Sequence, residues 1–319
     1  MTSTGNTAVQ LVTIDEAHDG QRVDNFLLTH LKGVPKSRIY RLLRKGEVRV
    51  NKGRVKPEYR LASGDSVRIP PIRLGDDTPP PKASDAALQR LDDAILYEDA
   101  QLIVIDKPSG MAVHGGSGVS FGCIEMLRQM RPEAPFLELV HRLDRETSGC
   151  LIIAKKRSAL NSLHQQIRDG KVDKYYLALL KGRWKKGAKR VDAPLLKNTL
   201  KSGERIVRVD ASGKPSLTVF EPVESFEHAA LMRIDLGTGR THQIRVHAQY
   251  LERPIAGDDK YGDRDFNAAM AQLGLKRLFL HATELRFLHP ESEVTMSVTA
   301  PLPDDLAAVL AQLRSARHT

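Results

Sequence analysis

Cysteine is scarce in this sequence, which has only Cys123 and Cys150 among its 319 residues. Two cysteines without a CxxC pair exclude a disulfide framework and a cysteine-bound zinc site, and they favour a reducing, cytoplasmic setting. Apolar runs of about eighteen residues are also lacking, so neither a transmembrane helix nor a membrane partner is expected. The first twenty residues do not have the basic and apolar segments of a secretory signal.

The usual motifs of metal and nucleotide sites are lacking as well. Ordinary loop or core roles are predicted for five histidines, because no HExxH or His/Cys spacing accompanies them: His114, His141, His242, His247 and His281. The stretch GGSGVSFG at 115–122 has neither GxxxxGK[ST] nor GxGxxG, which favours a flexible loop. No HxE with PCxxC is present, which disfavours a zinc-dependent base deaminase. No metal ion is expected.

Positive charge, by contrast, is abundant. The composition, 41% hydrophobic and 28% charged, is that of a folded globular protein, and the length suggests one small and one large domain. The formal net charge is +10, and between residues 35 and 60 ten lysines and arginines face only Glu47 and Glu58. This one segment therefore carries +8 and predicts a partner rich in phosphates.

Residues 20–70 are predicted to form a small helix-helix-hairpin unit. Apolar side chains at helical spacing follow Val23, and a second helix with a basic face ends at Gly46. Asn51-Lys52-Gly53 supplies turn chemistry, and a later strand is expected at 66–69. The basic face is either an ordinary solvated surface or an RNA-binding surface, for which the candidates are Lys36, Arg38, Arg41, Arg44, Lys45 and Arg49. The unit resembles the S4 RNA-binding domain, which implies recognition of structured RNA through phosphates and shape.

The passage PPIRLGDDTPPPKASDAA predicts an extended linker at 71–91, followed by a second domain at 92–319. Short β-rich runs outnumber the helical passages in this domain, so an α+β fold on a largely antiparallel sheet is expected. Strands are predicted at 94–97, 102–105, 111–113, 151–154, 175–180, 216–221, 229–235, 279–282 and 295–298, and helices at 121–130 and 158–169.

The stretch HRLDRETSG at 141–149 places Asp144 between Arg142 and Arg145, just before a predicted strand. One interpretation is a structural salt bridge, and the other is a carboxylate kept ionised beside a substrate. A later basic run, GTGRTHQIRVH at 237–247, contains Arg240 and Arg245, either of which can supply a partner for that carboxylate. Alone, this run is equally compatible with a basic patch or with a helix that begins at Thr241.

Taken together, HRLDRETSG, VDKYYLAL at 172–179, TGRTHQIRVH and RPIAGDDKYG at 253–262 resemble the RluA-type pseudouridine synthases, with KPSGMAVHGG at 107–116 as the lead-in. The resemblance implies an isomerase that converts uridine to pseudouridine without cofactor or metal. It makes Asp144 the catalytic aspartate, Arg245 its ion-pair partner with Arg240 as a rival, and Tyr176 the tyrosine that packs on the target base and takes its proton.

The same resemblance makes Arg142 the arginine that enters the space left by the flipped base. Lys107, Arg240 and His242 are further candidates for substrate binding, and Leu236 and Ile244 for walls of the uracil pocket. The implied partner is 23S ribosomal RNA or a large-subunit assembly intermediate, bound by a monomer. The alternatives are a noncatalytic RNA-binding or ribosome-assembly factor, an RNA glycosidase that releases the base, and a pseudouridine synthase for a different RNA.

Overall fold

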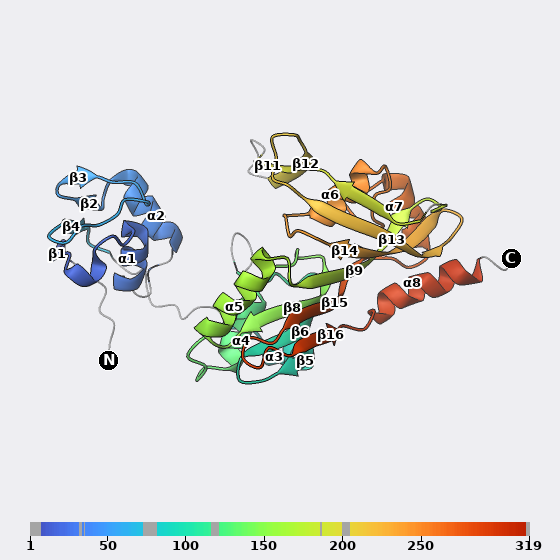
Figure 1. Cartoon of the computed structure of the whole chain (residues 1–319), viewed down its shortest axis with the longest axis horizontal. Coiled ribbons are helices and arrows are strands. Elements are labelled where there is room, and N and C mark those ends of the chain that lie inside the picture. Colours follow the sequence, from blue (N-terminus) through green and yellow to red (C-terminus); the bar gives the residue numbers. More distant parts are fainter. Residues whose placement is uncertain are drawn as a thin grey trace. The chain divides into compact units, whose positions relative to one another are not determined.

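The computed structural model describes residues 8–31, 34, 36–72, 82–115, 121–185, 187–199 and 205–316. The chain divides into two compact units, Met1–Pro81 and Lys82–Thr319 (Figure 1). The predicted linker is not extended throughout, because its last residues belong to helix α3 (Asp85–Asp92). Ser84 caps this helix by accepting from the Ala87 N–H, and the Leu91 side chain is fully buried. The central part of the predicted linker, 73–81, lies outside the described residues.

The first unit has the predicted helix-helix-hairpin arrangement. Helices α1 (Val23–His30) and α2 (Lys36–Lys45) pack on a four-stranded sheet of order β1-β4-β2-β3. Its strands are β1 (Gln10–Thr13), β2 (Arg49–Val50), β3 (Gly53–Arg54) and β4 (Ser66–Ile69). Asn51 and Lys52 both have positive φ, so the expected turn chemistry produces a two-residue hairpin.

A ten-stranded sheet forms the second unit and is mostly antiparallel, as predicted. Its main path is β10-β13-β14-β9-β15-β8-β6-β5, with β16 paired to β15 and β7 to β8. The strands are β5 (Ile95–Glu98), β6 (Leu102–Lys107), β7 (Glu138–Leu139), β8 (Ser148–Ala154), β9 (Asp173–Lys181), β10 (Lys189–Asp192), β13 (Leu217–Ser225), β14 (Ala229–Leu236), β15 (Leu280–Leu288) and β16 (Thr295–Thr299). The strand predicted at 111–113 is wrong, because this segment is an irregular loop.

Strand β15 joins the two halves of the sheet, although it comes late in the chain. It lies between β8, to which it is parallel, and β9, to which it is antiparallel. The parallel register places Ala282 opposite Gly149, whose φ is +110° and whose added Cβ would lie 2.2 Å from the Ala282 carbonyl oxygen. Glycine at 149 is therefore needed for this close strand approach.

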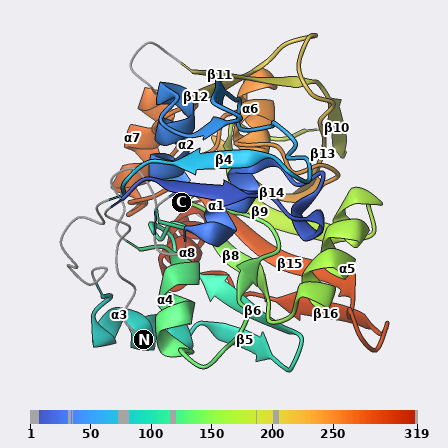
Figure 2. The same ribbon diagram turned by 90° about the vertical axis from the view of Figure 1, so that its left-hand side faces the viewer.

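Helices cover both faces of the sheet because its strands alternate their side chains. Ile103 and Ile105 of β6 pack in the same cluster as α4 (Cys123–Met130), whereas Leu102 and Val104 pack with α5 (Arg157–Arg168). In Figures 1 and 2, α3 and α4 lie near the β5 end of the sheet. Helices α6 (Gln243–Tyr250) and α7 (Arg264–Gln272) lie at the other end, near the hairpin of β11 (Leu195–Thr199) and β12 (Arg205–Val209). Helix α8 (Asp304–Ser315) ends the described chain. In the ranges that the structure describes, no helix is both long and apolar enough to cross a bilayer.

Candidate active site

Asp144 lies on a turn that leads into β8, and a neighbouring loop holds this turn in place. The Gly110 N–H donates to the Arg145 carbonyl at 2.9 Å, and Ser109 Oγ donates to the Glu146 carbonyl at 2.7 Å. In return, Arg145 Nε donates to the Gly110 carbonyl at 2.9 Å. Both residues that follow Asp144 are thus fixed through their backbone, which limits the movement of the carboxylate that precedes them.

Lys107 adds further hydrogen bonds to this turn, and its position corrects the prediction that it binds substrate. We call the contacts between residues 107–111 and residues 145–146 the clamp. Its side chain is fully buried, and its Nζ donates to the carbonyls of Pro108, Met111 and Arg145 at 2.9, 2.9 and 3.0 Å. Burial lowers the pKa of this ammonium to about 8. An ammonium has three hydrogens to donate, and all three have acceptors here, so no donor is left for RNA.

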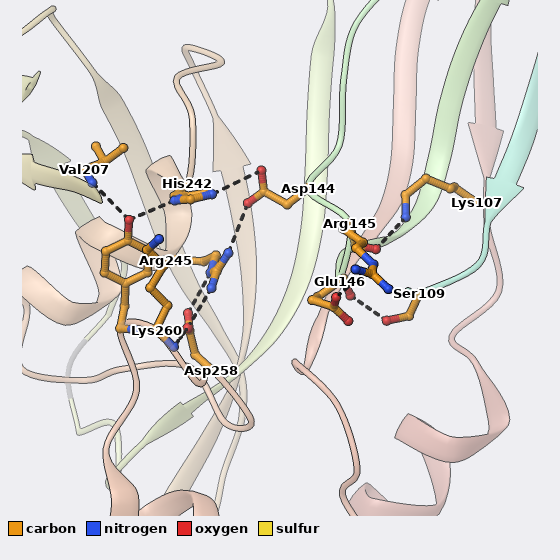
Figure 3. Close-up of polar contacts among 11 residues, drawn as sticks. Lys107, Ser109, Asp144, Arg145, Glu146, Val207, His242, Arg245, Asp258 and Lys260 are labelled. Carbon is orange, nitrogen blue, oxygen red and sulfur yellow. Dashed lines mark hydrogen bonds and ion pairs between the residues drawn. The ribbon is translucent and has the colours of Figure 1, made fainter. Parts of the chain in front are cut away.

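The cation beside Asp144 comes from helix α6 rather than from the arginines that flank it in sequence. Arg245 Nη1 lies 3.5 Å from Asp144 Oδ2 (Figure 3). Arg145 instead pairs with Glu146 at 3.6 Å, and the described residues contain no ion-pair partner for Arg142. Asp144 therefore pairs with neither of the arginines that flank it in sequence, and the predicted contact with Arg245 is present.

Arg245 is held more tightly by a second carboxylate, Asp258, which the sequence motifs do not single out. Its Nε and Nη2 donate to the two Asp258 oxygens, both at 2.8 Å, and Asp258 also accepts from the Lys260 and Tyr261 N–H groups at 2.9 Å. Burial alone would raise the pKa of Asp258, but Arg245 outweighs it and keeps that pKa below its usual value. The only sequence signal was the position of Asp258 in RPIAGDDKYG, where a neighbouring aspartate gives no reason to choose between them.

His242 lies near Asp144 Oδ1, whereas Arg245 contacts the other carboxylate oxygen of Asp144. Its Nε2 lies 3.9 Å from Asp144 Oδ1, and its Nδ1 lies 2.8 Å from the Tyr261 hydroxyl, which accepts from the Val207 N–H. Burial lowers the pKa of His242, which favours the neutral ring. A neutral ring that accepts the Tyr261 proton at Nδ1 presents Nε2–H towards Asp144. His242 has a φ of 53°, an uncommon conformation for a side chain of this size, at the N-terminus of α6.

A small pocket of about 70 Å³ brings most of the predicted site residues together. Its walls include Arg142, Asp144, Tyr176, His242 and Arg245, together with the two predicted apolar walls, Leu236 and Ile244. The Arg142 side chain is exposed at this pocket. Arg240 lines the same pocket, but its Nε donates to the Pro215 carbonyl at 3.3 Å, so it is not the ion-pair partner of Asp144.

Tyr176 is only 6% exposed and presents its ring to the pocket. Burial and the neighbouring negative charge of Asp144 raise the pKa of its hydroxyl. A tyrosine acts as a base through its phenolate, so this environment disfavours the predicted proton transfer. An apolar ring face remains well suited to stacking on a base.

The basic residues of the first unit are mostly on its surface. The side chains of Arg41, Arg44, Lys45 and Arg49 are exposed, Arg38 is partly buried, and the Lys36 side chain lies outside the described residues. Within this unit, the buried Asp24 accepts from Arg22 at 2.6 Å and from the Tyr40 hydroxyl at 3.0 Å, which ties α2 to α1.

Known proteins resemble both units. The family model described as RNA pseudouridylate synthase matches residues 101–250, and the S4 domain model matches residues 21–67. The ribosomal large subunit pseudouridine synthase C of Pasteurella multocida (strain Pm70) is 58% identical over 315 residues, which cover 98% of this chain and 97% of that protein. The protein of the same name from Escherichia coli (strain K12) is 57% identical over 321 residues, covering 99% of each chain.

Among solved structures, human RNA pseudouridylate synthase domain containing 4 is similar with a TM-score of 0.59 and 28% identity, covering 72% of this chain and 96% of that one. These likenesses confirm the predicted α+β fold and both resemblances found in the sequence. Since the two bacterial relatives match it at 58% and 57% identity over almost its whole length, the chain belongs to the RNA pseudouridylate synthase family, with an S4 domain at its N-terminus.

Proposed function

We propose that this protein isomerises uridines of 23S ribosomal RNA to pseudouridine. The observation that carries the proposal is the Asp144 carboxylate in a pocket, 3.5 Å from Arg245 and beside the ring of Tyr176. The names of the relatives, ribosomal large subunit pseudouridine synthase C, support this choice of RNA. The S4 domain supports a structured RNA substrate, because such a unit binds through phosphates and shape.

The reaction moves one glycosidic bond within a nucleotide. The bond between ribose C1′ and uracil N1 breaks, the base rotates, and C1′ bonds to C5, while the C5 proton is lost to solvent and N1 gains a proton. Asp144 acts in its ionised form, as the nucleophile or base at the sugar or at the pyrimidine ring. The contact from Arg245 at 3.5 Å is longer than a strong charge-assisted hydrogen bond, so the carboxylate oxygen stays available.

Access to C1′ and C5 requires the nucleotide to leave its stack, which costs a few kcal/mol. In this proposal the Arg142 guanidinium fills the space that the base vacates, since a planar cation stacks among bases. Tyr176 supports the extruded base with its ring face, which in comparable stacks contributes about 1–3 kcal/mol. The raised pKa of Tyr176 makes it a platform in this scheme rather than a base.

The basic unit at 20–70 supplies affinity, and the domain at 92–319 carries out the isomerisation. Lys and Arg contacts to phosphates make this affinity strongly dependent on salt. We also propose that the chain works as a monomer, because one chain supplies Asp144, Tyr176 and Arg245 to the same pocket, and that it works in the cytoplasm.

The test uses a 23S rRNA transcript that contains 5-tritiated uridine and measures the release of tritium. Wild type is expected to release it, and Asp144→Asn, which is almost isosteric but uncharged, is expected to bind the RNA without releasing tritium. Glu146→Gln is the matched control, because Glu146 lies on the same turn and its side chain is exposed. Activity in Asp144→Asn refutes the role of Asp144, absence of release by wild type favours the binding-factor alternative, and free uracil in the products identifies a glycosidase.

A further inference from the structure

A second groove of about 470 Å³ continues from the catalytic pocket. The two spaces share the segment Gly239, Arg240 and Thr241 as a common wall. The groove runs from there to the β11–β12 hairpin and to the turn at 212–214. Its volume lies within the range of about 300–1,000 Å³ that is typical of ligand sites, whereas the catalytic pocket alone is much smaller.

Apolar packing and backbone contacts hold the residues that line the groove in place. Leu195 and Val207 of the hairpin are 4% and 2% exposed and pack in one cluster with Val246 of α6 and with Tyr261. On the other side, Leu195 and Lys214 exchange backbone hydrogen bonds at 2.9 Å in both directions. Gly213 is packed so closely that an added Cβ would lie 2.4 Å from the Leu195 carbonyl carbon. These contacts fix the backbone that carries the lysines of the rim.

Three cations line this groove: Lys197, Lys214 and Arg240. All three side chains are exposed, and none has a carboxylate partner within ion-pair distance among the described residues. Asp210, the acid closest in sequence to Lys214, is already bound to Arg208 at 2.9 Å and to Ser212. By contrast, the exposed Arg314 of this unit pairs with Glu224 at 2.8 Å. The groove therefore has uncompensated positive charge next to the catalytic pocket.

We infer that this groove binds the ribose-phosphate of a nucleotide next to the target uridine in the same RNA strand. This inference rests on the proposed function. A strand whose base enters the catalytic pocket must continue over an adjoining surface, and the shared wall at 239–241 leads it into the groove. Lys197 and Lys214 contact phosphates there, and the Arg240 guanidinium lies where the strand passes from one space to the other.

The test compares the double variant Lys197→Gln/Lys214→Gln with wild type in the tritium-release assay. These two lysines line only the groove, so the Asp144 pocket keeps all of its residues. The loss of two exposed contacts predicts a rise in KM of about 2- to 30-fold while turnover at saturating RNA persists. The slope of log affinity against log salt is expected to become shallower by about 1.4, that is, about 0.7 for each lost phosphate contact. Lys189→Gln, an exposed lysine of β10 outside both spaces, is the matched control.

A second measurement locates the contact on the RNA. Transcripts ethylated at random phosphates are reacted, the converted molecules are separated after carbodiimide labelling of pseudouridine, and the ethylation sites are mapped. With wild type, ethylation within about two nucleotides of the target is expected to block conversion, and with the double variant this local effect is expected to disappear. The same interference in both enzymes, or a double variant that behaves like Lys189→Gln, overturns the inference while leaving the proposed function intact. A wild type that releases no tritium overturns both.

Discussion

The pair between Asp258 and Arg245 offers a sharp test of how the site is organised. In Asp258→Asn one oxygen remains as an acceptor, but the negative charge and one of the two hydrogen bonds at 2.8 Å are lost. Both side chains are buried, with exposed fractions of 1% and 10%, so the loss is expected to cost about 2–3 kcal/mol of unfolding free energy. The remaining carboxylate near Arg245 is Asp144, and the guanidinium is expected to move towards it.

This movement has a predictable effect on catalysis. The Arg245–Asp144 contact at 3.5 Å would shorten towards about 2.8 Å, the distance of a charge-assisted hydrogen bond, and would tie up the reactive oxygen. Because displacements of about 1 Å at a reacting group can cost about 100-fold in rate, kcat is expected to fall by that order. KM is expected to change little, because Arg142 and the basic residues of the S4 domain are untouched.

The assay is tritium release at a temperature where circular dichroism shows both proteins fully folded. Asp263→Asn is the matched control, because Asp263 caps α7 and pairs with Lys181 at 2.6 Å without touching the site. A second readout is pH. The pKa of Asp258 is lowered in the folded protein, so its stabilisation is complete above about pH 4 and is lost as pH falls through the folded value, a loss that Asp258→Asn should lack. If Asp258→Asn is less stable but turns over like wild type, Asp258 is merely structural and the reasoning fails.

Three further predictions concern the framework of the site. Lys107→Gln is expected to lower the unfolding free energy by roughly 3 kcal/mol and to lower kcat, because the turn at Asp144 loses its clamp. Urea denaturation measures the first effect and tritium release the second. A variant with unchanged stability and unchanged kcat would contradict the clamp. Gly149→Ala is expected to give little folded protein, since its Cβ would collide with the Ala282 carbonyl, and a thermal melt like that of wild type would rule out the close approach. Burial lowers the pKa of His281 to about 4, so the unfolded state takes up a proton at a higher pH than the folded state. The free energy of unfolding should therefore fall between about pH 6.5 and pH 4, by up to about 1.4 kcal/mol per pH unit for this group. His281→Gln should flatten this pH profile, measured by urea titrations.

Much of the fold could be predicted because its signals are local. Short β-rich runs predicted β6 and β9, and Asn51-Lys52-Gly53 predicted the hairpin of the first unit. The segment 111–113 has the composition of a strand, yet its Met111 carbonyl accepts from Lys107 and forms part of a clamp. Helix α3 was hidden in a proline-rich context, although Ser84 before an Asp-Ala-Ala run was a usable capping signal.

The sequence predicts site residues only where they belong to recognisable motifs. Asp144, Arg245 and Tyr176 belong to such motifs, and the structure brings them to one pocket. By contrast, the sequence does not show whether a lysine is exposed or buried, so the prediction that Lys107 contacts substrate is wrong. Asp258 was missed because its importance lies in a contact with Arg245 that exists only after folding.

The late strand β15 also constrains when activity can arise during synthesis. Asp144 belongs to the β8 half of the sheet, whereas Tyr176 and Arg245 belong to the half built on β9 and β14, and in the described sheet β15 joins the two halves. Residues 280–288 must therefore leave the ribosome before the carboxylate and its arginine can meet, and such long-range pairing is slow to form. Until then, a nascent chain can already bind RNA through its folded N-terminal domain, although its active site is incomplete. RNA binding is therefore expected to precede isomerase activity during synthesis.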